Sequence, residues 1–344
     1  MAMSFFTILR SKERSVVKRA KNVIIDKNGV NKLAEEVIDF MLCNQHSIVL
    51  GTTFIRQLPG LYPSFFDIRN ADWLFVLHTL NFSLLIPNSI RQWTVNKYTG
   101  FWALCSAIKR AIDDGKSIWD PNYYMNIGSI EFEYIFRGDD EITLPYLKER
   151  YIILQNVGKT LKKTYNGSFI NCVRASGYNA NKLTKMLFKF DSYQDEVIFQ
   201  QKRIRLYTKA KLLISDLRTY FPISPEEPVK TSTLLIDYSA SQVLLQFKAI
   251  HYTDHLHALL KNGILIYGDI EELEIRCCLI YAVQMVYDEV RRIYEKCVKH
   301  TSILDTLVSR ISTVVDNYIF HYQIMHNARL MYTIPLYHIR TTNY

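Results

Sequence analysis

Apolar residues recur at the three- and four-residue spacing of a helix in segments distributed along the chain, and this pattern predicts a mainly α protein. The segments with this spacing are residues 30–41, 100–112, 147–161, 209–221, 241–250, 271–297 and 303–324. Alternation of apolar and polar positions is rare. It predicts a strand pair at residues 196–199 (EVIF) and 203–207 (RIRLY), with a further short extended piece at 233–236. The pattern therefore predicts helices with a small β-sheet or hairpin.

The composition also favours helix over a turn-rich all-β fold, because only 12 of the 344 residues are Gly and 9 are Pro. With 49% hydrophobic and 22% charged residues, the chain is neither disordered nor collagen-like. Its length allows one large domain or two ordinary ones. Three prolines lie in residues 222–228 (PISPEEP), a segment that fits a tight connection better than a domain boundary.

One apolar stretch, residues 73–87 (WLFVLHTLNFSLLIP), is long enough to be compared with a membrane helix. It is interrupted by His78, Asn81 and Ser83 and is shorter than the roughly 20 residues that span a bilayer. We therefore expect this stretch in the core of the protein and expect no membrane partner.

Lys and Arg exceed Asp and Glu by 42 − 33 = 9, and this net charge suits a polyanion, a phosphorylated ligand or a solvated surface. The basic residues are dispersed, which favours the solvated surface and gives no support for a stable nucleic-acid complex. The densest stretch, residues 10–21, has features of a mitochondrial presequence or a nucleic-acid arm, but Glu13 within it favours an ordinary N-terminal helix. Residues 1–15 are a candidate for a flexible arm.

The six cysteines form no C-x-x-C pair and no Cys/His set at zinc spacing, which fits a reducing, intracellular compartment. Glycine-rich phosphate loops, dinucleotide fingerprints, nucleophile elbows and zinc-protease helices have no match in the sequence. Asp254, His255 and His257 lie close together, but their spacing places the two histidines on different faces of a helix. The residue patterns therefore predict no metal site.

A helix, turn, helix unit is predicted at residues 260–276 (LKNGILIYGDIEELEIR). Gly268 ends the turn, Asp269 can cap the second helix, and Glu272 follows three residues later, as in a capping box. Such a unit can present backbone N–H groups to a phosphate, although most units of this kind are packing corners.

Eight segments, in order along nearly the whole chain, together match one known family. They are residues 23–35 (VIIDKNGVNKLAE), 80–83 (LNFS), 98–115 (YTGFWALCSAIKRAIDDG), 147–161 (LKERYIILQNVGKTL), 167–176 (GSFINCVRAS), the pair Asp237 and Tyr238 with Gln242 after it, 267–277 (YGDIEELEIRC) and 339–344 (IRTTNY). Together they resemble the queuosine salvage family, the queuosine 5′-phosphate N-glycosylases.

The resemblance implies a single, mostly helical domain over residues 1–344, similar to helix-hairpin-helix DNA glycosylases. It implies hydrolysis of queuosine 5′-phosphate to queuine, for reuse in tRNA modification, and ribose 5-phosphate, without a metal or organic cofactor. The expected partner is this small nucleotide. The expected location is the cytoplasm, with the nucleus as an alternative and the mitochondrion less favoured. A homologue that binds the nucleoside or base, with weakened or no catalysis, is the other interpretation of the same resemblance.

Cleavage of the bond between ribose and base builds positive charge on the sugar. A buried carboxylate beside the anomeric carbon can stabilise this charge, attack the carbon, or activate a water molecule that attacks it. In the family, the Asp of an Asp-Tyr pair has this role, and the resemblance assigns it to Asp237. A queuine-binding Asp in the late helix matches Asp316, where a carboxylate can pair with the amine of the queuine side arm. On sequence alone, Asp237 fits a helix cap equally well, and Asp316 fits an exposed acid or an i, i+4 pair.

The match to LNFS places Asn81, Phe82 and Ser83 near the base, although a buried Phe with two satisfied polar neighbours is the plainer interpretation. For the 5′-phosphate, the basic candidates are Lys209, Arg276 and Arg340.

Several positions of the expected site carry a residue other than the usual one of the family. They are Pro59 for a His, His78 for an Asp, Thr208 for a Lys, Leu235 for an aromatic residue, Asn317 for a Tyr and His321 for an Asp. Leu235, Asn317 and His321 are counted among the substrate-binding candidates. The exchanges predict a weakened or changed preference for the queuine side arm. Lys209 or Lys211 can substitute for the Lys expected at residue 208, either in binding phosphate or in shaping the pKa of Asp237.

Overall fold

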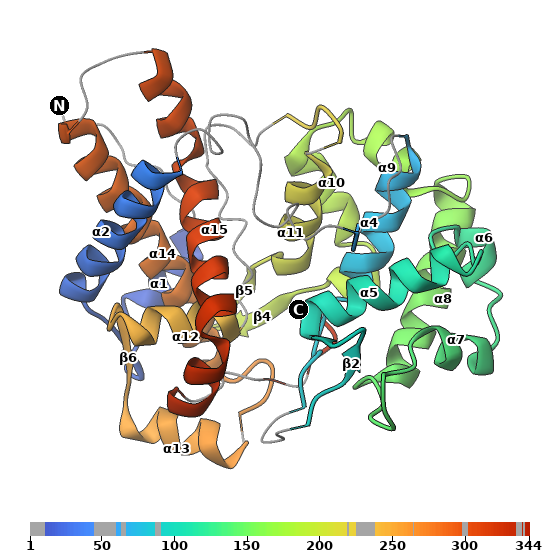
Figure 1. Ribbon diagram of the computed structural model, residues 1–344, viewed down its shortest axis with the longest axis horizontal. Coiled ribbons are helices and arrows are strands. Elements are labelled where there is room, and N and C mark those ends of the chain that lie inside the picture. Colours follow the sequence, from blue (N-terminus) through green and yellow to red (C-terminus); the bar gives the residue numbers. More distant parts are fainter. Residues whose placement is uncertain are drawn as a thin grey trace. The chain divides into compact units, whose positions relative to one another are not determined.

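The computed structural model describes residues 11–44, 60–62, 67–86, 91–218, 220–224, 238–263, 265–297, 302–334, 339 and 341–344. Within these residues the fold is mainly helical, and the strands form three two-stranded sheets (Figure 1). The predicted fold class, mainly α with a small β component, is confirmed.

The chain divides into two compact units, and each is assembled from separate stretches of sequence. The first unit comprises Met1–Leu58, Val197–Ile204 and Glu227–Ile339, and the second comprises Pro59–Glu196, Arg205–Glu226 and Arg340–Tyr344. Each unit therefore depends on residues that lie far apart in the sequence. The expectation of a single domain over the whole chain stays a prediction.

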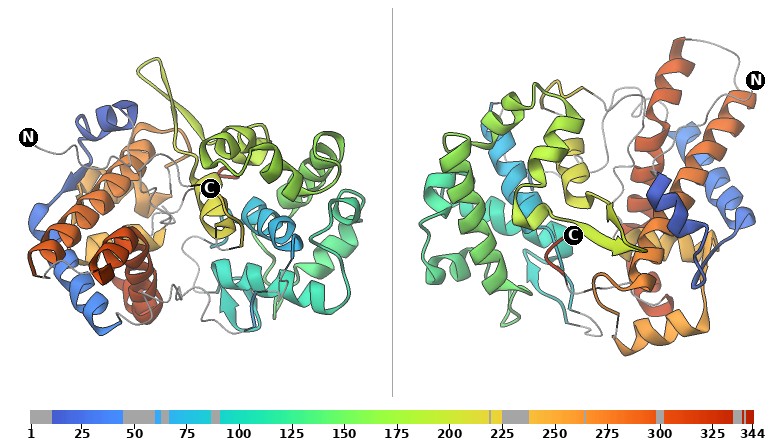
Figure 2. Two further views of the ribbon diagram at one scale, coloured as in Figure 1. Left: turned by 90° about the horizontal axis from the view of Figure 1, so that it is seen from above. Right: turned by 180° about the vertical axis from the view of Figure 1, so that it is seen from behind.

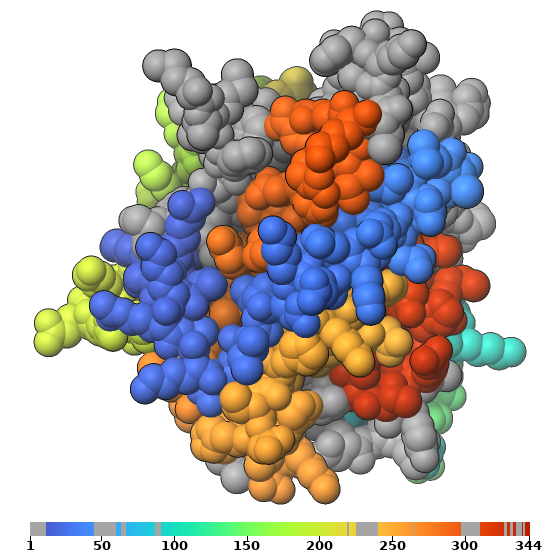
Figure 3. Space-filling model, turned by 90° about the vertical axis from the view of Figure 1, so that its left-hand side faces the viewer, coloured from blue at the N-terminus to red at the C-terminus, as the bar shows by residue number. Residues whose placement is uncertain are grey.

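Long helices make up most of the first unit. Its elements are α1 (Ser11–Val17), β1 (Val23–Ile25), α2 (Lys27–Cys43), α12 (Tyr238–Gln246), β6 (Ile250–Tyr252), α13 (Asp254–Asn262), α14 (Ile270–Cys297) and α15 (Ser302–Thr333). α14 packs along α1 and α2, while α15 packs along α12, α2 and α14. Figure 3 shows the surface on which α2, in blue, lies beside α14, in orange. The apolar stripe of α2, which includes Val30, Leu33 and Val37, is buried.

A short antiparallel ribbon joins distant parts of the first unit. β1 pairs with β6, so that Ile25 lies opposite Ile250. α2 begins directly after β1, and Asp26 caps it by accepting a backbone N–H of the first turn. Gly29 in this turn lies against the backbone of Lys248, where an added Cβ atom would be 2.2 Å from the carbonyl carbon. The close approach of the two backbones therefore requires glycine.

The second unit consists of shorter helices around one buried helix. Its elements are α4 (Arg69–Leu80), β2 (Thr94–Val95), β3 (Tyr98–Thr99), α5 (Gly100–Asp113), α6 (Pro121–Tyr124), α7 (Ser129–Ile135), α8 (Leu147–Thr164), α9 (Phe169–Ala175), α10 (Ala180–Leu187), the 3-10 turn η2 (Asp191–Tyr193) and α11 (Thr208–Leu217). Every residue from Asn70 to Leu80 is buried, because α5, α8, α9 and α11 pack around α4. The prediction that the apolar stretch beginning at Trp73 is core is confirmed for its described part. In the described ranges, no helix is both long and apolar enough to cross a membrane.

β4 (Glu196–Phe199) and β5 (Lys202–Arg205) form the hairpin that the alternating pattern predicts (Figure 2). Its turn residues, Gln200 and Gln201, have φ angles of 48° and 62°. Two left-handed residues in the loop suit the twist of the strands on either side. β5 ends at Arg205, before the predicted end at Tyr207.

Some predicted helix ends are wrong. α12 ends at Gln246, because Lys248 takes a φ angle of 58° and Ile250 enters β6. α15 continues beyond the predicted end to Thr333, and α11 ends earlier than predicted. Residues 11–15, predicted as part of a flexible arm, lie in α1, while residues 1–10 and the extended piece at 233–236 lie outside the described residues.

The predicted capping box before α14 is wrong in its hydrogen bonds. α14 begins at Ile270, directly after Asp269, as predicted. The Asp269 carboxylate, however, accepts a hydrogen bond from Ile266 N at 2.9 Å, and Glu272 Oε2 accepts one from Gly268 N at 3.4 Å. The Asp269 side chain therefore closes the preceding turn instead of capping the helix.

Candidate functional site

Residues 81–83, the last three of the LNFS match, follow the last residue of α4 in the second unit, and all three are buried. Asn81 ends the helix in a non-helical conformation. Ser83 has a φ angle of 40°, in the left-handed region that residues other than glycine rarely adopt. Strained backbone of this kind clusters at functional sites, and it persists only where surrounding contacts hold it.

Two buried cations hold this segment. Arg150 of α8 donates from Nη2 to the carbonyl oxygens of Phe82 and Ser83, the latter at 3.4 Å, and its guanidinium carbon lies 4.0 Å from the centre of the Phe82 ring. Lys209 of α11 has its Nζ 4.9 Å from the centre of the same ring and donates to Thr79 O at 3.4 Å. The Phe82 ring is thus in contact with two cations.

Thr341 contacts the same segment, and Thr342 contacts Lys209 beside it. Ser83 Oγ donates to Thr341 O at 2.8 Å and accepts from Thr341 N at 3.1 Å. Lys209 Nζ donates to Thr342 O at 2.8 Å. The structure therefore brings together two of the segments that carry the family resemblance, LNFS and IRTTNY.

Burial lowers the pKa of both cations, because a surrounding of low dielectric constant penalises the charged form. It lowers the pKa of Arg150 to about 9. It holds the pKa of Lys209 well below its usual value, and the charge of Arg150 lowers it further, while Asp195 opposes the shift. The carbonyl oxygens around these two groups therefore offset a large desolvation cost.

Asn81 has a buried side-chain donor, Nδ2, without a partner among the described residues. Buried donors in native structures are normally paired. An unpaired amide next to a strained, firmly held backbone is suited to donate to a bound molecule.

Two positions that depart from the expected family residues make polar contacts within the second unit. Thr208 donates from N and Oγ1 to Asp195 Oδ2 at 3.1 and 3.0 Å. His78 Nε2 lies 2.7 Å from Asp216 Oδ2. The nearby buried ammonium group is that of Lys209, one residue after the position where the resemblance leads us to expect a Lys.

Asp316 of α15, in the first unit, is buried and hydrogen-bonded to α14. The Tyr287 hydroxyl donates to Asp316 Oδ1, and the two residues are only 5% and 7% exposed. The interpretation of Asp316 as an ordinary exposed acid is therefore wrong. A phenol that donates to one carboxylate oxygen fixes the direction in which the carboxylate points.

Asn317 and His321 lie on the same helix and are both partly exposed. The centre of the His321 ring lies 5.9 Å from that of Phe40 in α2, and Phe40 lies 5.4 Å from Tyr318. The Tyr318 hydroxyl is 3.5 Å from Glu36 Oε2, and burial raises the pKa of Tyr318. His321 is therefore part of an aromatic contact between α2 and α15.

Asp237 and Leu235, the predicted catalytic carboxylate and one binding candidate, lie outside the described residues. α12 begins at the next residue after Asp237, Tyr238. Its buried Gln242 donates from Nε2 to Leu330 O of α15 at 3.4 Å. The role of Asp237, as catalytic group or helix cap, stays a prediction.

The two described basic candidates for the phosphate, Arg276 and Lys209, are buried. Arg276 has no exposed surface and forms an ion pair with Glu272 at 3.3 Å, which gives its assignment to the phosphate no support. Lys209 is buried to almost the same extent. Arg340 lies outside the described residues.

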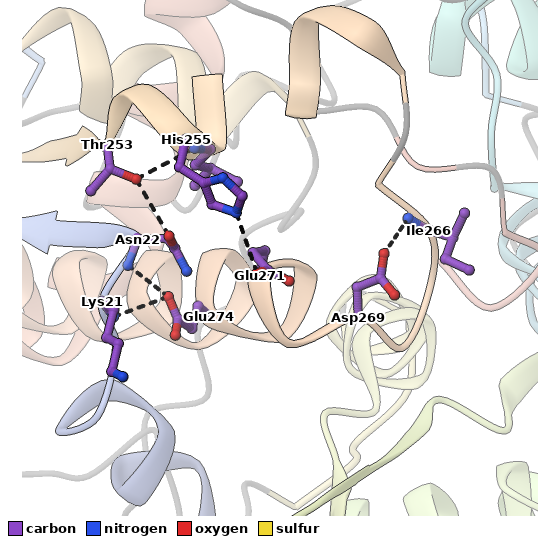
Figure 4. A network of polar contacts seen from close by, with 9 residues as sticks. Lys21, Asn22, Thr253, His255, Ile266, Asp269, Glu271 and Glu274 are labelled. Atoms are coloured by element: carbon purple, nitrogen blue, oxygen red, sulfur yellow. Dashed lines mark hydrogen bonds and ion pairs between the residues drawn. The ribbon is translucent and has the colours of Figure 1, made fainter. Parts of the chain in front are cut away.

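Asp254, His255 and His257 do not gather around one point. His255 Nε2 lies 3.8 Å from Glu271 Oε1 in the polar network of Figure 4, and the His257 ring makes an edge contact with Tyr252. Across the part of the chain that the structure describes, no three His, Cys, Asp or Glu side chains are grouped as a metal site needs.

The sequence did not point to Arg150 or Tyr287. Their partners Phe82 and Asp316 lie 68 and 29 residues away, so no local spacing reveals either contact. The position of Arg150 within the matched segment 147–161 was the only available signal.

Comparison with known proteins gives one consistent family. The sequence model described as queuosine salvage protein matches residues 62–344, a range that contains Asn81, Lys209 and Asp316. The queuosine 5′-phosphate N-glycosylase/hydrolase of Mus musculus is 33% identical over 296 residues, which cover 83% of this chain and 86% of that protein.

Two further relatives carry the same name. The protein from Bos taurus is 30% identical over 345 residues and covers 97% of this chain and 98% of its own length. The protein from Sphaerobacter thermophilus is 30% identical over 287 residues, with 81% of this chain and 83% of that protein covered. The similarity thus extends over most of each chain.

Proposed function

The chain belongs to the queuosine salvage protein family, and from this premise we propose that it hydrolyses the N-glycosidic bond of queuosine 5′-phosphate and releases queuine. The observation that carries the proposal is the similarity, over most of the chain, to relatives named for that activity. The released queuine is reused in tRNA modification. Because the substrate is a mononucleotide, we expect no stable nucleic-acid complex. We also propose that the reaction takes place in the cytoplasm.

The chemistry is assigned to Asp237. As the bond between ribose and base breaks, positive charge develops on the sugar, and a carboxylate beside the anomeric carbon stabilises that charge. α12 begins directly after Asp237, at Tyr238, and its Gln242 donates to Leu330 O of α15. Neither a metal ion nor an organic cofactor is part of the proposal.

The base is assigned to groups that donate or carry charge. Queuine is a 7-deazaguanine, so the departing base has no N7 to protonate and needs hydrogen bonds from the protein. The buried amide of Asn81 supports a role as one such donor, with Phe82 and Ser83 beside it. Asp316 is proposed to accept the cationic amine of the queuine side arm in a charge-assisted hydrogen bond.

The neighbouring candidates Leu235, Asn317 and His321 are proposed to set how strongly the side arm is bound. At residue 321, a histidine stands where relatives are expected to carry an aspartate. The exchange removes one carboxylate that could pair with the amine of the queuine side arm. The preference for the side arm is therefore expected to be weaker than in relatives that keep the acid.

The test is direct. Purified protein is incubated with queuosine 5′-phosphate, and free queuine and ribose 5-phosphate are measured by mass spectrometry. Equal amounts of both products are expected, and the same result is expected after dialysis against a chelator. Unchanged substrate after long incubation at high protein concentration would contradict the proposal.

A further inference from the structure

We propose that Arg150 and Lys209 are positioning residues for residues 81–83, and that substrate binding weakens when either one is replaced. The inference rests on the proposed function, because it says how one part of the substrate-binding site is held in place. Neither residue has to touch the substrate for this role.

The last carbonyl groups of a helix have no partner within the helix, and buried ones need donors from elsewhere. Thr79 O lies in the last turn of α4, and the carbonyls of Phe82 and Ser83 lie just beyond it. Arg150 donates to the carbonyls of Phe82 and Ser83, and Lys209 donates to that of Thr79. The path of the chain after α4 is therefore fixed by two cations.

Phe82 separates Asn81 from Ser83, and both its carbonyl and its ring contact Arg150. The Lys209 ammonium faces the ring of Phe82 and lies 5.4 Å from the ring centre of Tyr193. Because both its backbone and its side chain are held, Phe82 restricts the orientations that Asn81 and Ser83 can adopt.

Arg110, in the same unit, also donates to two backbone carbonyls, those of Ile135 at 3.0 Å and Arg137 at 2.7 Å. No positive φ angle is found at those two residues, whereas Ser83 beside the Arg150 contact has one. Arg110 is thus a matched arginine that holds ordinary backbone, and it provides a control.

The experiment compares Arg150→Lys and Lys209→Met with Arg110→Lys in the full chain. Lys keeps the charge of Arg150 but cannot donate to two carbonyls in the same geometry, and Met fills the volume of Lys209 without its donor. Steady-state hydrolysis of queuosine 5′-phosphate gives kcat and KM. Hydrogen exchange followed by mass spectrometry reports on the peptide that contains residues 81–86.

Both test variants are expected to raise KM about 10- to 100-fold, as loss of a buried charge-assisted hydrogen bond typically does, with a much smaller change in kcat. The exchange rate of the 81–86 peptide is expected to rise in the same variants. Arg110→Lys is expected to leave KM and this exchange rate within about two-fold of the wild type.

The outcomes are distinguishable. A wild type without hydrolysis contradicts the proposed function, and the exchange rates then decide the positioning role alone. Wild-type KM and exchange in either folded variant would overturn the inference for that residue. A similar KM increase in Arg110→Lys, or failure of both test variants to fold, would make the cations a requirement of the fold and would also overturn it.

Discussion

Two regions of the molecule hold their candidate binding groups by different means. In the second unit, the cations Arg150 and Lys209 bind backbone carbonyls and hold a whole segment of chain. In the first unit, the neutral phenol of Tyr287 binds the carboxylate of Asp316 and holds a single side chain. Removal of one cation should therefore disturb several neighbouring residues of the segment, since each cation contacts both its backbone and the ring of Phe82. A side chain held by a neutral donor should lose only its own contact.

The largest effect is expected for Asp237→Asn, which tests whether the two regions only bind the substrate while Asp237 carries out the chemistry. Asp237→Asn keeps the size of the side chain and its ability to cap α12, but removes the charge. Loss of one transition-state charge contact costs about 3–4 kcal/mol, so the rate is expected to fall ~100- to 1000-fold with nearly unchanged KM. Single-turnover hydrolysis and melting temperature are measured on both proteins. An unchanged rate would leave Asp237 as a helix cap.

The next prediction uses pH to test how far the second unit depends on buried charge. Asp72, near the start of α4, accepts hydrogen bonds from Phe169 N and Ser168 Oγ, yet burial raises its pKa to about 6. The folded pKa lies above the unfolded one, so this group contributes stability at low pH that is lost as pH rises through about 4 to 6. The loss should reach up to about 3 kcal/mol.

Asp72→Asn removes that titration. The free energy of unfolding of the variant, relative to the wild type, is therefore expected to increase between pH 4 and pH 7, and chemical denaturation at both pH values measures it. Parallel pH profiles of the two proteins would show that Asp72 does not titrate in this range.

Asp316→Asn tests the side-chain contact of the first unit. The substitution removes the charge that is proposed to pair with the amine of the queuine side arm, so KM for queuosine 5′-phosphate should rise about 10- to 100-fold. Binding of an analogue whose 7-deazaguanine base lacks the side arm should not change. The exposed Asp254 supplies the control Asp254→Asn. Equal losses for both ligands would show that Asp316 does not recognise the side arm.

The smallest effect is expected for Tyr287→Phe. It leaves the charge of Asp316 in place and removes one neutral donor, which is worth about 1 kcal/mol, so KM should rise ~5-fold. Tyr318→Phe is the control, because it also removes one tyrosine hydroxyl, from α15. The contact of that hydroxyl with Glu36 is long, at 3.5 Å, so KM should rise less. A larger effect of Tyr287→Phe than of Arg150→Lys would reverse the comparison between the two regions.

The helices could be predicted from the sequence because their spacing is a local property. The pattern at residues 100–112 and 147–161 predicts α5 and α8 nearly to their ends. It failed at Ile250, which continues the apolar spacing of α12 but pairs with Ile25 across the ribbon. A partner so distant in sequence leaves no trace in a periodicity.

The candidate site could be predicted only in part. The resemblance pointed to residues 81–83 and to Asp316, but it could not say what holds them, because Arg150 and Tyr287 come from other helices. It also offered Arg276 to the phosphate, since a charge in a sequence carries no sign of its burial beside Glu272. Supporting contacts depend on packing, which only the folded chain defines.

The ribbon of β1 and β6 also bears on the order in which the protein is made. Ile25 and Ile250 pair across 250 − 25 = 225 residues, so a ribosome must add all of them before this contact can form. Most of the second unit, by contrast, lies in the continuous stretch Pro59–Glu196 and can assemble earlier during synthesis. β1 and the adjoining α2 must therefore wait, with their apolar stripe uncovered, while the second unit is still being made. During that interval, the uncovered apolar stripe of α2 is open to aggregation.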